Sequence, residues 1–288
     1  MASVRRAYCV HGCSDNYAFF TEGKAAMRQC FIILLGTACI CACLLSCAGR
    51  QSATKAPTAS TCSAAFDPLP APGHEKGFKS IFDGKTLNGW KGADMSFWTV
   101  EDGAITGKIT TEHPTERNHY LVYQGGKLGD FELKLRHRVL SKDNVNCGFQ
   151  FRSEIFDGKI PDDCRGYQMD NNTGTPWLVR LYDEHGRETL AWRGEKAVFD
   201  ASGQRTVTPI EGATGEARFR LEDWHEYHLI CRGSDISLRV NGRLVSEAID
   251  GDPSQRDLSG ILALQLHSGP PMTVQFKDIR LKMLATEK

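Results

Sequence analysis

Alternation of apolar and polar residues is the strongest pattern in this chain. In the segment DFELKLRHRVL, Phe131, Leu133 and Leu135 fall on one face, and charged residues occupy the positions between them. A period of two residues is typical of a β-strand with one buried face. Similar short runs recur as far as residue 283, and none of them has the 3.6-residue period of an amphipathic helix. The pattern therefore predicts an all-β protein.

Short turns divide the alternating runs into strands. Glu101-Asp102-Gly103 separates SFWTV from AITGKI, and Asn241-Gly242 separates DISLRV from RLVSEAI, so both pairs are expected to form β-hairpins. Further strands are expected in HYLVYQ, CGFQFRSE, RGYQMDN, WLVRLYDE, EYHLICR, GILALQLHS and MTVQFKDIRLKML. Many short strands at regular spacing favour a β-sandwich. The charged stretch from Arg193 to Gly215 lacks the alternation, and we expect a loop on one rim there.

The N-terminal part of the chain does not share this pattern. Residues 27–47 begin with a basic position, continue as an apolar run and end in Leu-Leu-Ser-Cys, an arrangement that resembles a lipoprotein signal peptide. We expect Cys47 to carry a lipid and the protein to be an exported, membrane-anchored lipoprotein that faces the periplasm or the cell surface. Ordinary cleavage near Ala48, without a lipid, is the alternative.

The signal peptide defines the remaining boundaries. Residues 1–26 precede it and are interpreted as an over-extended N-terminus, with Met27 as the initiator. Residues 48–75 are rich in Ser, Thr, Ala and Pro and predict a flexible linker. The folded domain is therefore expected to span residues 76–285.

Charge and cysteine content exclude several classes of protein. The 288-residue chain has 35 basic and 35 acidic residues, so it lacks the excess of positive charge that a nucleic-acid-binding protein needs. Beyond the signal peptide only four cysteines remain: Cys62, Cys147, Cys164 and Cys231. A Cys147–Cys164 disulfide is one expectation, and four unpaired cysteines are the other. No cysteine–histidine cluster indicates a zinc site.

Four of the expected strands have polar outer faces that differ from an ordinary solvated surface. Their side chains are amides, guanidinium groups, carboxylates, a phenol and an imidazole, and lysine is absent from them. The four sets are Gln150, Arg152 and Glu154; Gln168 and Asp170; Arg180, Tyr182 and Glu184; and Gln265 and His267. If these strands are neighbours in one curved sheet, their polar faces form a single concave floor. Such side chains suit a sugar, because each hydroxyl is both a donor and an acceptor.

An ordered series of motifs resembles a known family. The series comprises FKSIFDGKTLNGWKG, FWTVEDGAITG, GDFELKLRHRVLSKDNVNCGFQFRS, GYQMDN, LYDEHGR, EDWHEYHLICRG, LRVNGRLV and GILALQLHSGPPMTVQFKDIRLK. Together these segments resemble the 3-keto-disaccharide hydrolase domain over about residues 76–284. The resemblance implies a concanavalin-like jelly-roll β-sandwich of two antiparallel sheets, one of them concave and polar. It also implies hydrolysis of a disaccharide or glycoside oxidised at C3, with a sugar 3-dehydrogenase acting upstream.

This activity requires a base near C2, a group that stabilises an enolate oxygen, and an acid for the leaving group. We expect His267 or Asp170 as the base, Arg152 with Gln168 at the enolate oxygen, and Glu184 or Tyr182 as the acid. The remaining substrate-binding residues are expected to be Gln150, Glu154, Arg180 and Gln265. A divalent metal bound by Asp170 and His267 could replace Arg152, and no other cofactor is expected.

Three other functions are compatible with the same residues. A direct two-carboxylate glycosidase could use a pair drawn from Asp170, Glu154 and Glu184. A lectin-like module would bind glycans without cleaving them. A structural lipoprotein would do neither.

Overall fold

The computed structural model describes residues 75–156, 158, 160–173, 179–213 and 220–285. The predicted signal peptide, Cys47, Cys62 and the linker lie outside these residues, so export and lipidation stay predictions. Within the described ranges, no helix combines the length and the hydropathy needed to cross a membrane.

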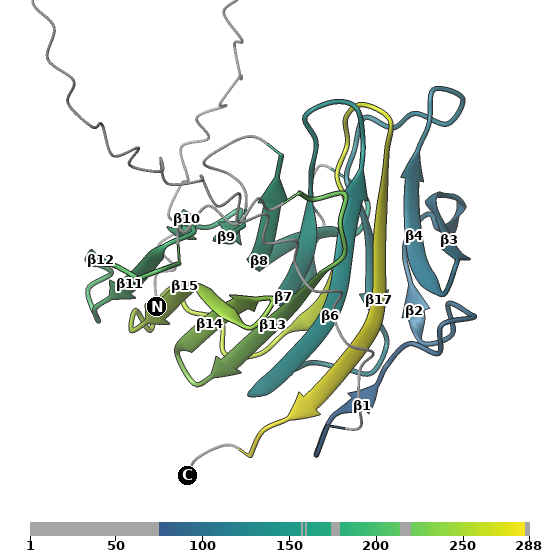
Figure 1. Ribbon diagram of the computed structural model, residues 1–288. Coiled ribbons are helices and arrows are strands. Elements are labelled where there is room, and N and C mark those ends of the chain that lie inside the picture. The colour runs from purple at the N-terminus through teal and green to yellow at the C-terminus, as the bar shows by residue number, and fades with distance from the viewer. Residues whose placement is uncertain (1–74, 157, 159, 174–178, 214–219, 286–288) are drawn as a thin grey trace, which may run out of the picture. The chain divides into compact units, whose positions relative to one another are not determined.

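In these residues, seventeen strands form two sheets (Figure 1). The ten-stranded sheet has the order β12 (Arg205–Pro209), β11 (Glu195–Phe199), β15 (Arg243–Asp250), β14 (Asp235–Val240), β13 (His225–Arg232), β6 (Phe131–Leu140), β17 (Met272–Met283), β4 (Ala104–Ile109) and β3 (Trp98–Glu101), with β1 (Lys79–Ser80) paired to β17. The seven-stranded sheet has the order β10 (Glu188–Ala191), β9 (Arg180–Glu184), β8 (Asp163–Asn172), β7 (Asn146–Phe156), β16 (Ile261–Leu266), β5 (His119–Tyr123) and β2 (Trp90–Lys91).

Neighbouring strands are antiparallel except β11 and β15, which are parallel. The one helical element of the described residues is a 3₁₀ turn, η1 (Met95–Phe97). The all-β sandwich of two sheets expected from the sequence is therefore confirmed.

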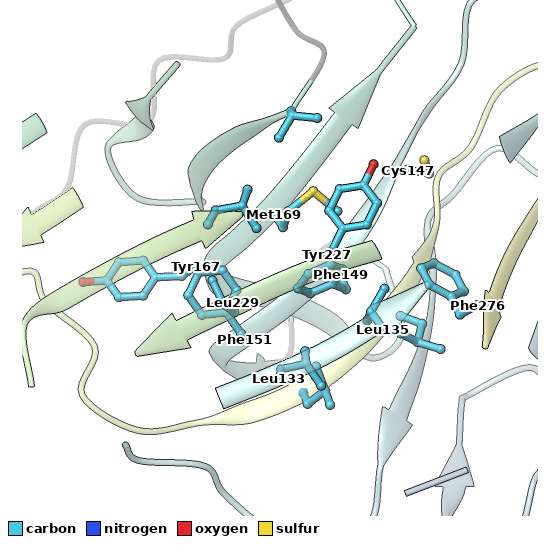
Figure 2. Close-up of a cluster of buried hydrophobic side chains, with 14 of the residues drawn as sticks. Leu133, Leu135, Cys147, Phe149, Phe151, Tyr167, Met169, Tyr227, Leu229 and Phe276 are labelled. Carbon is cyan, nitrogen blue, oxygen red and sulfur yellow. The ribbon is translucent and has the colours of Figure 1, made fainter. Parts of the chain in front are cut away.

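The core lies between the two sheets, where their apolar faces meet. Leu133 and Leu135 of β6 and Phe149 and Phe151 of β7 are fully buried, and Figure 2 shows them in one cluster with Tyr227. Burial of each such side chain contributes about 1.5–3 kcal/mol. The alternation in the sequence thus corresponds to one face packed in the core and one face outside it.

The two predicted hairpins are confirmed. Asp102 and Gly103 have φ values of 50° and 73°, and Asn241 and Gly242 have φ values of 50° and 79°. Positive φ at both central residues is the geometry of a type I′ turn, whose twist matches that of the paired strands.

The expectation of a loop from Arg193 to Gly215 is wrong for residues 193–213, the part of this segment that the structure describes. This segment contains β11, which pairs with β15, and β12, which pairs with β11 at the edge of the ten-stranded sheet. Every residue of β12 is exposed, so the strand needs no apolar face and shows no alternation. An edge strand of this kind cannot be recognised by hydrophobic periodicity.

The expectation that Arg152 faces outward with Gln150 is also wrong. The register of β7 shifts against both neighbouring strands, between Gln150 and Glu154 on one side and opposite Ile261–Leu262 on the other. Arg152 has φ 48° within this bulge. A bulge adds one residue to a strand and reverses the faces of the residues that follow it.

The Arg152 side chain instead joins the two sheets. Its guanidinium donates from Nε to the Gly129 carbonyl (2.9 Å), from Nη1 to the Gly233 carbonyl (2.6 Å) and from Nη2 to Asp130 Oδ1 (2.9 Å). These acceptors lie next to β6 and β13 of the ten-stranded sheet, and the Arg152 side chain is fully buried. Glu154, beyond the bulge, forms a surface ion pair with Arg165.

The expected Cys147–Cys164 disulfide is absent. Cys147, Cys164 and Cys231 are buried and unpaired. Cys147 lies on the core side of its sheet, 3.3 Å from His137 Nε2, whereas Cys164 packs with Tyr120 and Ala263 in a separate cluster. The two sulfur atoms therefore lie on opposite faces of one sheet, and the alternative of unpaired cysteines is confirmed for these three.

The Arg152 linkage predicts a large effect on stability. Replacing Arg152 by methionine leaves the Asp130 carboxylate and two carbonyl groups without their buried donor. We expect the free energy of unfolding to fall by about 3–5 kcal/mol, measured by urea denaturation. Arg165→Ala, which removes an exposed ion pair, is the control and should cost less than about 1 kcal/mol. Equal losses for the two variants would contradict this account of Arg152.

Candidate functional site

The outer face of the seven-stranded sheet carries a row of polar side chains. Asp170 of β8 and Gln265 of β16 both pair with Gly148 of β7, from opposite sides. Arg180 of β9 pairs with Asp170, and Tyr120 of β5 pairs with Gln265. Paired residues share a face, so this row crosses five adjacent strands.

Adjacent rows carry most of the other predicted residues. Gln168 pairs with Tyr182 on one side and with Gln150 on the other, and Glu184 pairs with Gly166. His267 directly follows the end of β16, and it lies close enough to Asp170 of the same face to interact with it electrostatically. The structure therefore brings together Gln150, Gln168, Asp170, Arg180, Tyr182, Glu184, Gln265 and His267, and it places Arg152 and Glu154 elsewhere.

Gly148 is the centre of this face. Asn146 and Gln150 flank it along β7, and Asp170 and Gln265 flank it on the neighbouring strands. With strands about 4.8 Å apart, the Cα atoms of Asp170 and Gln265 are about 10 Å from each other, and no side chain stands between them. A Cβ atom on Gly148 would lie 2.1 Å from the Met169 carbonyl oxygen, so the backbone of this position requires glycine.

Three polar atoms around Gly148 have unused hydrogen-bonding capacity. Asn146 Oδ1, Gln150 Nε2 and Asp170 Oδ1 are buried and have no hydrogen-bond partner in the structure. Buried polar atoms are nearly always paired, and an unpaired group needs an explanation. One donor and two acceptors around a bare glycine match the hydroxyl and carbonyl groups of a sugar derivative. We therefore interpret this face as the candidate site.

Asp170 is oriented by Arg180. Its Oδ2 accepts a hydrogen bond from Arg180 Nε at 2.5 Å, and Arg180 Nη1 donates to Thr189 Oγ1 at 2.7 Å. The guanidinium also stacks on Tyr182, 4.2 Å from the ring centroid, and on Trp192 at 5.3 Å. Burial raises the pKa of Asp170, and the charge and hydrogen bond of Arg180, together with a hydrogen bond from Asn146, oppose that rise. The ion pair occupies Oδ2, whereas Oδ1 has no partner within hydrogen-bond geometry.

The amides across the sheet are linked in a chain. Gln168 Nε2 donates to Gln265 Oε1 at 2.8 Å, and Gln265 Nε2 donates to the Tyr120 hydroxyl at 3.4 Å. Asn118 Nδ2 also donates to this hydroxyl, and burial raises the pKa of the Tyr120 phenol. Gln168 Nε2 and Gln265 Nε2 each have a partner, whereas Gln150 Nε2 has none.

His267 is held as one tautomer. Its Nδ1 lies 2.6 Å from the Ser268 carbonyl oxygen, which can only accept a hydrogen bond, so Nδ1 carries the proton. The Ser268 backbone N–H donates to Asn118 Oδ1 at 2.9 Å, which holds this short turn. Nε2 of the neutral ring therefore has the lone pair and can accept a proton.

Glu184 differs from Asp170 because no arginine hydrogen-bonds to it. Burial raises the pKa of Glu184 to about 7; His185 opposes this rise, and the negative charges of Asp170 and Asp163 add to it. A carboxyl group with a pKa near neutrality is suited to act as a general acid. Burial raises the pKa of Tyr182 to about 12, so this phenol is the weaker acid of the two predicted alternatives.

The sequence reasoning missed several residues of this face. Asn146, Gly148 and Tyr120 were not among the predicted site residues. The alternation alone could have found them. Asn146 and Gly148 lie four and two residues before Gln150 and therefore face the same way, and Tyr120 is next to Leu121, which faces the core. Ser153 could not have been found in this way, because the bulge at Arg152 places it on the outer face.

Comparison with known proteins identifies the family. The model of the 3-keto-alpha-glucoside-1,2-lyase-like domain matches residues 77–282. The chain belongs to this family. The resemblance inferred from the ordered motifs is thus confirmed. A 3-keto-disaccharide hydrolase from Bacteroides thetaiotaomicron is 37% identical over 119 residues, which cover 35% of this chain and 41% of that protein. The chain therefore spans less than half the length of that relative.

Similar solved structures come from other bacteria. A protein assigned as a candidate glycosyl hydrolase from Parabacteroides distasonis has 19% identity and a TM-score of 0.47, covering 73% of this chain and 94% of its own. A carbohydrate-binding module from Bacillus subtilis has 15% identity and a TM-score of 0.43, covering 67% of this chain and 95% of its own.

The requirement for glycine at position 148 can be tested directly. Gly148→Ala forces the new methyl group against the Met169 carbonyl, so we expect the protein to lose about 1–3 kcal/mol of stability, with displacement of β7 against β8. Thermal unfolding measures this loss. Gly129→Ala is the matched control, because a Cβ atom there meets nothing nearer than 3.9 Å. A Gly148→Ala protein as stable as the control would contradict the packing described.

Proposed function

We propose that this chain cleaves glycosides whose sugar carries a ketone at C3, by elimination across C1 and C2 followed by addition of water. Membership of the family supports this substrate class. The observation that carries the proposal is the unpaired Gln150 Nε2 and Asp170 Oδ1 on the same sheet face as His267 and Glu184.

The first step is removal of the C2 proton. A ketone at C3 makes this proton acidic, because the electron pair of the C2–H bond can move onto the ketone oxygen. His267 Nε2 takes the proton, since its lone pair is fixed by the hydrogen bond from Nδ1 to the Ser268 carbonyl. Asp170, whose Oδ2 is held by Arg180, instead orients the sugar by accepting a hydroxyl hydrogen bond at Oδ1.

The enolate oxygen then needs a hydrogen-bond donor. Arg152, predicted for this role, is fully engaged with the other sheet, and Gln168 donates to Gln265. Gln150 Nε2 is the buried donor on this face without a partner. A donor fixed in a water-poor site before the reaction stabilises developing negative charge strongly.

Departure of the leaving group completes the elimination. The enolate electrons restore the C3 ketone, a C1=C2 double bond forms, and the bond from C1 to the leaving oxygen breaks. Glu184 protonates that oxygen, as a carboxyl group with a pKa near 7 can do at neutral pH. Water then adds across C1=C2, which gives net hydrolysis. Because the substrate must first be oxidised at C3, a sugar 3-dehydrogenase would act upstream.

A divalent metal on Asp170 and His267 is an addition that these residues would fit. Asp170 Oδ1 and Asn146 Oδ1 are unpaired, and His267 Nε2 has its lone pair available, so a carboxylate, an amide and an imidazole could serve as ligands. In the described part of the chain, no three His, Cys, Asp or Glu side chains gather as metal ligands. A bound ion would polarise the ketone.

The decisive experiment uses a 3-keto-glucoside in deuterium oxide. We expect release of the leaving group, with deuterium at C2 of the sugar product, measured by NMR and mass spectrometry. His267→Gln should lower kcat by about 10²–10⁴-fold. Glu154→Gln is the control, because Glu154 lies on the surface with Arg165, and it should leave kcat unchanged.

Two results would replace this proposal by another. Cleavage without deuterium at C2 would indicate direct hydrolysis by a carboxylate pair. Tight binding of the 3-keto-glucoside with no turnover would indicate a lectin-like module.

The role of Glu184 predicts a pH dependence. A general acid must be protonated, so kcat should fall as the pH rises through about 7, the pKa of Glu184. Glu184→Gln should abolish this decline and lower kcat by about 10²–10⁴-fold for an alkyl glycoside. A 4-nitrophenyl glycoside, whose leaving group needs no proton, should largely restore the activity of the variant. An unchanged pH profile in Glu184→Gln would exclude Glu184 as the acid.

A further inference from the structure

The bulge in β7 turns a serine toward the candidate site. Ser153 pairs with Ile261 of β16 and is 2% exposed, immediately after the inward-pointing Arg152. In a regular strand, residue 152 would face outward with Gln150, and residue 153 would face the core. The extra residue reverses this order, so Ser153 and Gln150 lie on the same face.

The Ser153 hydroxyl is fixed by its own surroundings. Its Oγ lies 2.9 Å from the Tyr167 carbonyl of β8 and 3.1 Å from the Phe151 carbonyl of its own strand. It also lies 3.0 Å from Gln150 Oε1, to which it donates. The hydroxyl has one proton and three acceptors in reach, so the hydrogen bond that it donates is shared between the oxygen end of the Gln150 carboxamide and the two backbone carbonyls.

No other side chain on the neighbouring strands engages the Gln150 amide. Its partner on β8, Gln168, donates to Gln265, and its partner on β16 is Ala263, which has no polar side-chain atom. Gln150 is fully buried and its Nε2 is unpaired. The terminal torsion of glutamine is intrinsically broad and roughly two-fold, so the two ends of the amide would exchange readily without a fixed contact.

The orientation of this amide decides its effect on the reaction. With Oε1 held by Ser153, the group presents a donor to the site. With the amide reversed, it would present a carbonyl oxygen, which repels a developing enolate. We propose that Ser153 is a positioning residue that selects the donor orientation of Gln150. This inference rests on the proposed function, in which Gln150 Nε2 stabilises the enolate.

A double-mutant cycle tests the proposal, because Ser153 is argued to act only through Gln150. We expect Gln150→Leu to lower kcat for a 3-keto-glucoside by about 10²–10³-fold, as loss of such a donor does elsewhere. Ser153→Ala should lower kcat by roughly tenfold with little change in KM, and Ser153→Thr, which keeps the hydroxyl, should restore it. The double variant should be no slower than Gln150→Leu alone.

Structural damage would give a different result. If Ser153 only stabilises the fold, the two effects on kcat will multiply, and that outcome overturns the proposal. Thr106→Val is the matched control, since it removes a buried hydroxyl of the ten-stranded sheet that donates to the Ala104 carbonyl, and its kcat should equal that of the wild type. Thermal unfolding of every variant shows which of them remain folded.

The failure of this inference can be distinguished from failure of the proposed function. If the wild type binds the 3-keto-glucoside but does not turn it over, the proposed function fails. The double-mutant cycle of Gln150→Leu and Ser153→Ala is then repeated with calorimetry, and the quantity compared is Kd. Non-additive losses in Kd then support the role of Ser153, and additive losses reject it. A wild type that neither binds nor cleaves the 3-keto-glucoside would overturn both.

Discussion

A buried arginine between the two sheets determines how the candidate site is arranged. Arg152 donates to two carbonyl groups and to Asp130 on the ten-stranded sheet, and it does so from a left-handed backbone conformation in β7. A buried guanidinium is costly unless all its partners are in place, so these contacts hold the bulge in one geometry. The bulge places Ser153 on the outer face, where it holds the Gln150 amide. Contacts of Arg152 with the ten-stranded sheet therefore affect the Gln150 amide, which lies on the outer face of the seven-stranded sheet.

The strands and their faces could be predicted from the sequence because alternation is a local property. Each outward residue in β8, β9 and β16 was assigned correctly, since side chains alternate between the two faces along a regular strand. The same rule gave the wrong face for Arg152 in β7, because Phe149-Gln150-Phe151-Arg152 alternates in the sequence without any sign of the bulge. The bulge depends on Gly129, Asp130 and Gly233, which become neighbours of Arg152 only in the folded chain. β12 was missed for the opposite reason, because a fully exposed edge strand has no apolar face to detect.

The site itself was only partly predictable, for a related physical reason. Polar side chains such as Asp170 and Gln168 attract attention in a sequence, whereas Gly148 has no side chain to suggest a role. Its importance comes from the Met169 carbonyl on the next strand and from the four polar residues around it. Likewise, the sequence could not distinguish Gln150 from Gln168, because the difference between them is which amide nitrogen already has a partner.

The two carboxyl groups of this face have different environments, and this difference assigns their roles. Burial raises the pKa of both, but Asp170 also forms a direct ion pair with Arg180, which favours its charged form. Glu184 has no such partner; His185 Nε2 is 4.0 Å away, and two nearby carboxylates disfavour its ionisation. Two acids in such different environments can divide the tasks of binding and of proton donation. The aromatic rings of Tyr182 and Trp192, stacked on Arg180, maintain this difference by holding the guanidinium against Asp170.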